Sequence, residues 1–120
     1  MGSYNGSIVY QKAYKLSMDI FERPKKFQPE EKYSLTDQIR RSSRSACVNL
    51  EEAYRRRKYK ADFVSKLTDS STENAETQVW LDFSKDCSFI EIHEYEDLKA
   101  RNDEVGKMIW HMIENPDKFI

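Results

Sequence analysis

Glycine is scarce in this chain of 120 residues. Its three glycines lie at positions 2, 6 and 106, so no glycine occurs between Ser7 and Val105. Phosphate-binding loops, hairpin turns and nucleophile elbows usually need glycine, because they require positive φ angles or a close approach of the backbone. The sequence therefore argues against these motifs and favours helices joined by short connections.

Cysteine and long apolar runs are also scarce. The two cysteines, Cys47 and Cys87, are too few for a disulfide framework, and we expect both to be packed thiols. No apolar run approaches the roughly 20 residues of a membrane-spanning helix, so no membrane association is expected. The first residues lack the basic segment and apolar stretch of a secretory signal. These features predict a cytoplasmic protein.

Catalytic and metal-binding patterns are missing as well. Neither His93 nor His111 follows a glutamate by three residues, as the ligands of a di-iron bundle do. Adjacent carboxylates such as Glu51 and Glu52 point about 100° apart on a helix, so they make poor acid–base pairs. We predict no catalytic residue, no metal site and no cofactor, and therefore no enzyme.

Apolar residues recur every three or four positions in four stretches of the chain. This spacing predicts helices at residues 8–22, 35–57, 61–86 and 94–114. Pro24 would end the first helix, residues 25–33 would form a loop, and Ser34 or Thr36 would cap the second helix. We predict one all-α domain over residues 1–120, an antiparallel up-down-up-down four-helix bundle. The expected core residues are Val9, Ala13, Leu16, Ile20, Leu35, Ile39, Ala46, Leu50, Ala53, Phe63, Leu67, Leu81, Tyr95, Leu98, Val105, Ile109 and Met112.

The inward stripe of the third predicted helix turns polar in its middle. Ser70, Asn74, Thr77 and Gln78 share the face of the core residues, and Ser42 lies on the core face of the second helix. One interpretation is a buried hydrogen-bond layer, since a buried polar group without a partner costs about 1–3 kcal/mol. The other is a ligand pocket. The layer is favoured, because no histidine, cysteine or carboxylate joins these residues in a catalytic pattern.

Charge divides the chain into two halves. Residues 1–60 carry 14 basic and 7 acidic side chains, whereas residues 61–120 carry 6 basic and 14 acidic ones. Much of the basic charge falls on one face of the second helix and in the run from Tyr54 to Lys60. Such a surface can neutralise phosphates while tyrosines stack on unpaired bases; a solvated surface and self-association are the alternatives. The candidates for binding RNA or DNA are Arg40, Arg41, Arg44, Arg55, Arg56, Lys58 and Lys60.

The third helix has the opposite character. It carries an acidic stripe and a second apolar patch away from the core, which suggests head-to-tail association with the basic face of another copy. The candidates for this interface are Val48, Tyr54, Asp69, Glu73, Glu76, Trp80 and Phe83.

Two segments resemble the motifs of a known family. FQPEEKYSLTDQIRR at residues 27–41 is similar to its FPxEExygLtxQirR stretch, and SACVNLEEAYRR at residues 45–56 is similar to its SixxNiaEGxxR motif. This is the 23S rRNA intervening-sequence protein family, also called the four-helix bundle protein family and formerly labelled a ribosomal protein. Residues 62–90 follow its third motif. The chain departs from the pattern at Ala53, where the family has glycine, and at Thr72 and Glu73, where it has a small Gly-Ser pair.

The resemblance implies a small bacterial all-α protein, encoded in some species within insertions in 23S rRNA genes, with no established catalysis. Related accessory proteins of diversity-generating retroelements form homopentamers and bind nucleic acid and a reverse transcriptase. By similarity we expect a homo-oligomer, a pentamer, and a protein partner encoded nearby. Carried over by position, Asn49, Glu52 and Arg56 are the motif residues. A buried or half-buried hydrogen-bond cluster that ties the second helix to a neighbour is favoured over direct ligand binding.

Two functions follow from the sequence. The first is a non-enzymatic, oligomeric bundle that binds nucleic acid (rRNA, other RNA or DNA), or acts as an accessory protein, through the basic face of its second helix. The alternative is a purely structural module, in which the basic and acidic stripes form the homo-oligomer interface and no nucleic acid binds.

Overall fold

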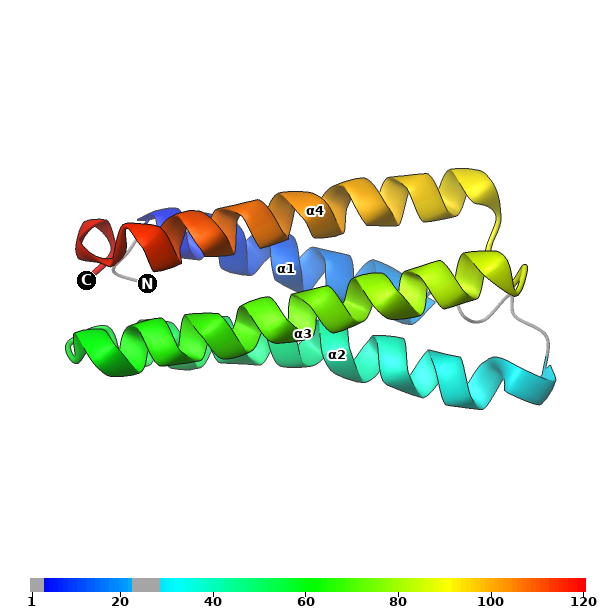
Figure 1. Ribbon diagram of the computed structural model, residues 1–120, viewed down its shortest axis with the longest axis horizontal. Coiled ribbons are helices and arrows are strands. Elements are labelled where there is room, and N and C mark those ends of the chain that lie inside the picture. Colours follow the sequence, from blue (N-terminus) through cyan, green and yellow to red (C-terminus); the bar gives the residue numbers. More distant parts are fainter. Residues whose placement is uncertain (1–3, 23–28) are drawn as a thin grey trace.

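Four long helices make up nearly all of the protein in the computed structural model, which describes residues 4–22 and 29–120 and the side chains of 8–22 and 34–120. They are α1 (Tyr4–Glu22), α2 (Pro29–Arg55), α3 (Lys60–Asp86) and α4 (Ile92–Glu114), followed by the short 3-10 helix η2 (Pro116–Lys118). They pack side by side into a rod of 45 × 22 × 20 Å (Figure 1). The described residues form no strand. The predicted all-α bundle is confirmed.

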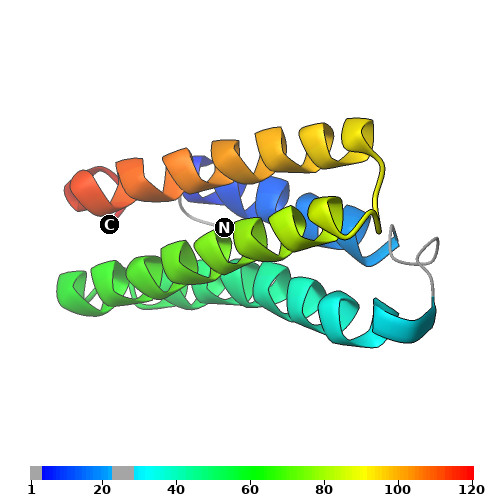
Figure 2. The ribbon, with the colours of Figure 1, turned by 45° about the vertical axis from the view of Figure 1, so that its right-hand side comes forward.

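Neighbouring helices run in opposite directions. Between α2 and α3, Ser42 bonds to Thr77 and Ser70 bonds to the backbone of Ala46, so rising positions in one helix meet falling positions in the other. Lys12 and Asp19 of α1 likewise pair with Glu104 and Arg101 of α4. Figures 1 and 2 show the same alternation of direction between neighbouring helices.

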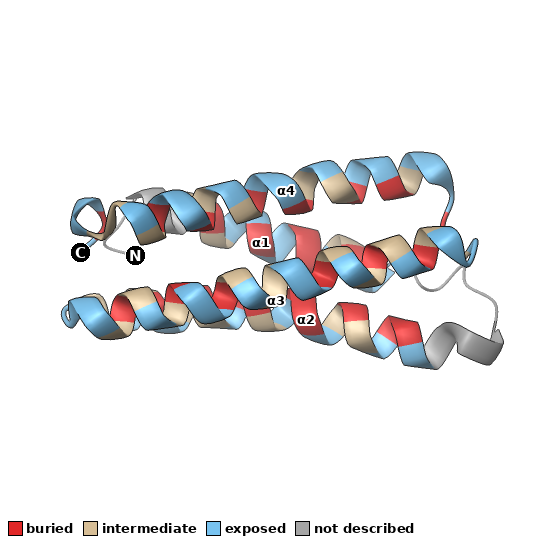
Figure 3. Cartoon of the chain, viewed as in Figure 1, coloured by how far each residue is buried: buried red, intermediate tan, exposed pale blue. Residues whose placement is uncertain are grey.

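The core lies where the apolar spacing places it. Every apolar residue named above for the core is buried, and Val9, Ala53, Leu67, Leu81 and Ile109 are completely inaccessible. In Figure 3 the buried positions form stripes along the helices that face one another. Burial of these stripes is the main favourable contribution to folding, at roughly 25 cal/mol per Å² of apolar surface.

All four helices begin earlier than predicted; α1 begins at Tyr4, four residues early, and α3 begins at Lys60, one residue early. The helix α2 begins at Pro29, inside the predicted loop, because proline is well tolerated in the first turn of a helix. Ser34 and Thr36 therefore lie within α2 and cannot cap it. The same helix ends at Arg55 rather than at residue 57, because the chain turns at residues 56–59. The helix α4 begins at Ile92, two residues early. Pro24, predicted to end the first helix, and residues 25–28 of the predicted loop lie outside the described residues.

The polar stripe of α3 is a hydrogen-bond layer. The Thr77 and Ser42 hydroxyl oxygens lie 2.8 Å apart, and the Ser70 hydroxyl donates to the Ala46 carbonyl oxygen at 2.7 Å. Asn74 Nδ2 donates to Asn102 Oδ1 at 2.9 Å, and Asn102 Nδ2 donates to the Asn74 carbonyl oxygen at 3.1 Å. These bonds connect α3 to α2 on one side and to α4 on the other, which agrees with the favoured interpretation of the sequence.

Phe119 closes one end of the bundle. It follows η2, is 5% exposed, and meets the His111 ring edge-on at a centroid distance of 5.9 Å. Lys60 at the start of α3 pairs with Asp117 of η2 at 3.0 Å. The C-terminus and the α2–α3 turn therefore lie at the same end of the rod, as Figure 1 shows.

Candidate interaction surfaces

Arg40 holds two helices together. Its Nη2 donates to the Phe21 carbonyl oxygen at 2.8 Å, and its guanidinium lies 4.3 Å from the centre of the Phe21 ring. The side chain is half-buried between α1 and α2. Arg40, one of the predicted nucleic-acid contacts, therefore stabilises the packing of α1 against α2.

Three other predicted contacts are exposed but have acidic partners. Each is bound to a carboxylate of its own chain, and such exposed pairs contribute little to stability. The pairs are Arg55–Glu51 at 3.0 Å, Arg56–Asp62 at 3.3 Å and Lys60–Asp117 at 3.0 Å.

Arg41 and Arg44 lie on the outer face of α2. Both side chains are exposed, and neither forms an ion pair with a described residue. Arg44 Nε donates to the Arg40 carbonyl oxygen at 3.1 Å, which leaves the rest of its guanidinium open. Val48, one turn further along, is 54% exposed. The open part of the predicted basic face thus combines two cations with an apolar side chain.

An apolar groove runs between α1 and α2. It has a volume of about 400 Å³, and we define this α1–α2 groove by Tyr10, Tyr14, Met18, Cys47 and Val48. Tyr14 is 53% exposed, and its ring lies 6.1 Å from that of Tyr10. Arg44 lines one part of the groove, and Glu51 and Glu52 line another. Val48, Arg44 and Glu52 were predicted for other roles, but the groove itself could not be predicted, because it depends on how two helices align.

The two cysteines differ in environment. Cys47 is buried as predicted, and burial raises the pKa of its thiol to about 11, so the thiol stays protonated and unreactive at neutral pH. Cys87 is exposed at the end of α3, which corrects the prediction that both thiols are packed. It lies off the core stripe of its helix.

The helix α3 exposes a separate apolar surface. We define this α3 patch by Val79, Trp80 and Phe83; Val79 is 47% and Phe83 is 51% exposed, and the rings of Trp80 and Phe83 lie 5.9 Å apart. The acidic side chains predicted for an interface share this helix. Burial raises the pKa of Glu73, and the neighbouring Glu76 raises it further, whereas the charge of Arg41 lowers it. The α3 patch therefore has an acidic border.

The family-motif residues each have a separate partner. Asn49 Nδ2 donates to the Ser45 carbonyl oxygen of its own helix at 2.9 Å. Glu52 pairs with Lys66 of α3 at 2.8 Å, and Arg56 pairs with Asp62 of α3. Glu52 and Arg56 thus tie α2 to α3, as the favoured interpretation expects. Both are exposed, so the predicted buried or half-buried cluster is corrected to separate surface contacts.

The turn between α2 and α3 gathers cations and tyrosines. We define the α2–α3 turn as residues 56–59. The Arg57 guanidinium lies 4.0 Å from the centre of the Tyr54 ring, and Lys58 Nζ lies 6.0 Å from that of Tyr59. Tyr54, a predicted interface residue, is half-buried beneath Arg57. Arg57 was absent from the predicted contacts, although it falls within the basic run of the sequence.

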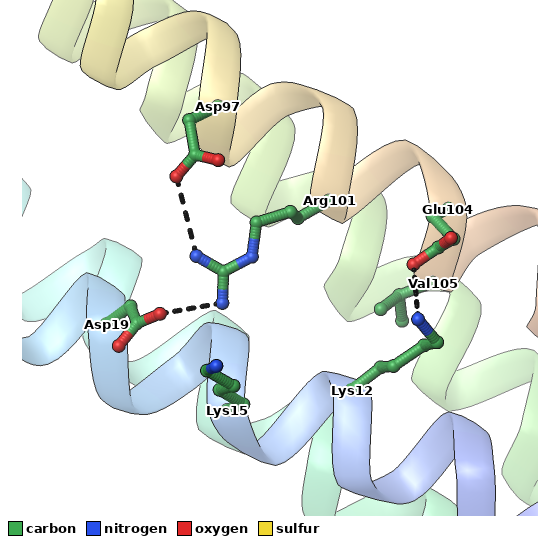
Figure 4. Close-up of a pocket in the computed structure, with 7 residues that line it drawn as sticks. All are labelled: Lys12, Lys15, Asp19, Asp97, Arg101, Glu104 and Val105. Atoms are coloured by element: carbon green, nitrogen blue, oxygen red, sulfur yellow. Dashed lines mark hydrogen bonds and ion pairs between the residues drawn. The ribbon is translucent and has the colours of Figure 1, made fainter.

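A charged groove lies between α1 and α4 (Figure 4). Lys12 pairs with Glu104 at 3.0 Å, and Arg101 pairs with Asp19 at 2.7 Å and with Asp97 at 3.5 Å. Cations and carboxylates are balanced here, so the groove joins the two helices with no net charge to attract an ion.

No group of three or more His, Cys, Asp or Glu side chains suited to a metal ion occurs within the described ranges. No described helix meets the length and hydropathy needed to cross a membrane.

Fold and surfaces together define a small helical-bundle protein with exposed apolar and basic surfaces. The sequence profile described as "23S rRNA-intervening sequence protein" matches residues 5–111, so the chain belongs to this family, as its motifs predict. The fold of the chain is similar to the crystal structure of a protein of unknown function from the S23 ribosomal protein family of Bacteroides thetaiotaomicron. The TM-score is 0.84 at 27% identity, over 92% of this chain and 98% of that one. No curated protein shows significant similarity to the chain. Neither the family nor the neighbour indicates a catalytic activity.

Proposed function

We propose that the protein is a non-enzymatic bundle that associates with copies of itself and presents basic surface to nucleic acid. The observation that supports this best is the presence of two exposed apolar surfaces, the α1–α2 groove and the α3 patch. Arg44 lines the groove together with Glu51 and Glu52, and Glu73 and Glu76 share α3 with the patch.

Self-association follows from the cost of exposed apolar area. Val48, Phe83 and Tyr14 are each more than half exposed in the single chain, and covering them with a second copy would remove this surface from water. The two surfaces are different parts of the molecule, so a contact between them is head-to-tail. A head-to-tail contact whose rotation closes gives a ring. A pentameric ring is the stoichiometry that the family resemblance favours.

The single-contact variants Val48→Glu and Phe83→Glu test this arrangement by sedimentation velocity. We expect the wild type to be an oligomer and each variant to be a monomer, because a buried carboxylate without a partner is costly. A mixture of the two variants should form dimers, since one intact groove then meets one intact patch. A symmetric groove-to-groove contact would give no such dimers.

Trp110→Glu, at an α4 side chain that is 54% exposed, is the matched control and should leave the oligomer intact. A monomeric wild type at micromolar concentration would contradict the proposal.

Nucleic-acid binding is the second part of the proposal. It is supported by the exposed guanidinium groups of Arg41 and Arg44 and by the cations of the α2–α3 turn. Cations on one surface bind phosphates by releasing condensed counterions. The alternative is a purely structural module in which the assembly buries the basic face of α2. Affinity for RNA that is unchanged by Arg41→Glu and Arg44→Glu, in an intact oligomer, would exclude binding through that face.

A further inference from the structure

Two cations of the α2–α3 turn lack the acidic partners that their neighbours have. Arg55, Arg56 and Lys60 are each paired with a carboxylate. Within the described part of the chain, Arg57 and Lys58 form no ion pair. The unpaired positive charge of the α2–α3 turn is therefore carried by these two adjacent residues. They are also the two whose side chains lie near tyrosine rings.

Arg57 is held in place by its own helix end. Its Nη1 donates to the Tyr54 carbonyl oxygen at 3.0 Å while the guanidinium lies over the Tyr54 ring. A guanidinium carries five N–H donors, so this contact leaves others for an oxygen ligand. Because the side chain is already ordered, little conformational entropy is lost when a phosphate binds.

Tyr59 presents an open aromatic ring on an ordered backbone. Its side chain is 61% exposed. Its backbone N–H donates to the Arg56 carbonyl oxygen at 2.9 Å, and its own carbonyl oxygen accepts from the Phe63 N–H at 2.9 Å. The ring is thus positioned by the start of α3, while most of its surface contacts water. Such a ring is a platform on which a free base can stack.

We propose that the α2–α3 turn binds an unpaired nucleotide of a single-stranded nucleic acid. The base stacks on Tyr59, and the flanking phosphates bind Lys58 and Arg57. In a duplex the faces of the bases are covered by their neighbours, so the site selects single strands over duplexes. This inference rests on the nucleic-acid part of the proposed function and adds the site and the form of the ligand.

Fluorescence anisotropy with a short labelled oligouridylate, the matching oligothymidylate and a duplex of equal length tests the site. Single strands should bind more tightly than the duplex. Tyr59→Ala should weaken single-strand binding roughly 5- to 150-fold, the range for one stacked base, whereas Tyr59→Phe should retain it. Lys58→Ala should also weaken binding. Trp110→Ala and Lys15→Ala, at an exposed aromatic and an exposed cation on other helices, should bind as the wild type does.

A second readout reports stacking directly. An oligonucleotide carrying 2-aminopurine should change its fluorescence on binding the wild type and Tyr59→Phe, and respond far less to Tyr59→Ala. Equal affinity of wild type and Tyr59→Ala, or tighter binding of the duplex, would overturn the site and leave nucleic-acid binding elsewhere intact. Failure of the wild type to bind any of the three probes at low salt would overturn both.

Discussion

At the scale of single residues, Gly106 lies within α4, although glycine is the least favourable residue in a helix apart from proline. A Cβ atom at this position would lie 2.6 Å from Asn74 Oδ1. Asn74 is the partner of Asn102 in the reciprocal bonds that join α3 to α4. The missing side chain leaves the space in which this amide pair forms.

Gly106→Ala should therefore lower the free energy of unfolding. Alanine gains about 1 kcal/mol in helix propensity over glycine, but displacing Asn74 leaves buried amide groups without partners at about 1–3 kcal/mol. We expect a net loss of up to about 2 kcal/mol in urea unfolding followed by circular dichroism. The double variant Gly106→Ala with Asn74→Ala should lose less than the two single changes added together. A Gly106→Ala variant more stable than the wild type would show that Asn74 moves aside at little cost.

At the scale of the helices, the contact between α2 and α3 depends on polar bonds within an apolar interface. Ser42 and Thr77 face each other across it, and Thr77 is completely buried. One hydroxyl donates to the other, and the accepting hydroxyl can donate its own proton to a backbone carbonyl of its helix, Ile39 for Ser42 or Glu73 for Thr77, so both protons have acceptors. The pair fixes how the two longest helices align.

A double-mutant cycle on Ser42→Ala and Thr77→Val should show this coupling. Each single change should cost about 1 kcal/mol, and the double variant should cost less than their sum, because removing both hydroxyls leaves none unpaired. Thr68→Val is the control, since the exposed Thr68 hydroxyl bonds only to the Val64 carbonyl oxygen of its own helix. Strictly additive changes in unfolding free energy would mean that the two hydroxyls act independently.

The helices and their inward faces could be predicted from the sequence, because burial repeats with the period of the helix. The start of α2 could not, since proline is common both in loops and at the first position of a helix, and Pro29, placed in the predicted loop, takes the helical position. The contact of Arg40 with Phe21 depends on which helix lies alongside, and the stacking of Arg57 on Tyr54 depends on the turn. Both contacts depend on how the helices are arranged in space, which the periodicity of apolar residues does not specify.

At the scale of the whole molecule, apolar and charged surfaces should respond differently to salt. The proposed self-association depends on covering apolar side chains such as Val48 and Phe83, which salt does not screen. The proposed nucleotide site depends on the unpaired charges of Arg57 and Lys58. The two activities should therefore separate in a salt titration.

Raising the salt concentration tenfold should weaken single-strand binding about 25-fold, the value for two phosphate contacts. The sedimentation coefficient of the protein alone should stay that of the oligomer over the same range, as long as apolar contacts dominate. If the oligomer instead dissociated over the same salt range in which the oligonucleotide is released, the assembly would depend on contacts between charged side chains.

The unequal cysteines give the protein one natural attachment point for a dye. A maleimide reacts with accessible thiolates, so it should modify Cys87 and spare Cys47, which is buried and has a raised pKa. Cys87 ends the same helix that begins beside the α2–α3 turn, so a fluorophore there lies at the far end of the rod from that turn. Energy transfer between dyes at Cys87 could then report the spacing of subunits in an assembly without engineered cysteines.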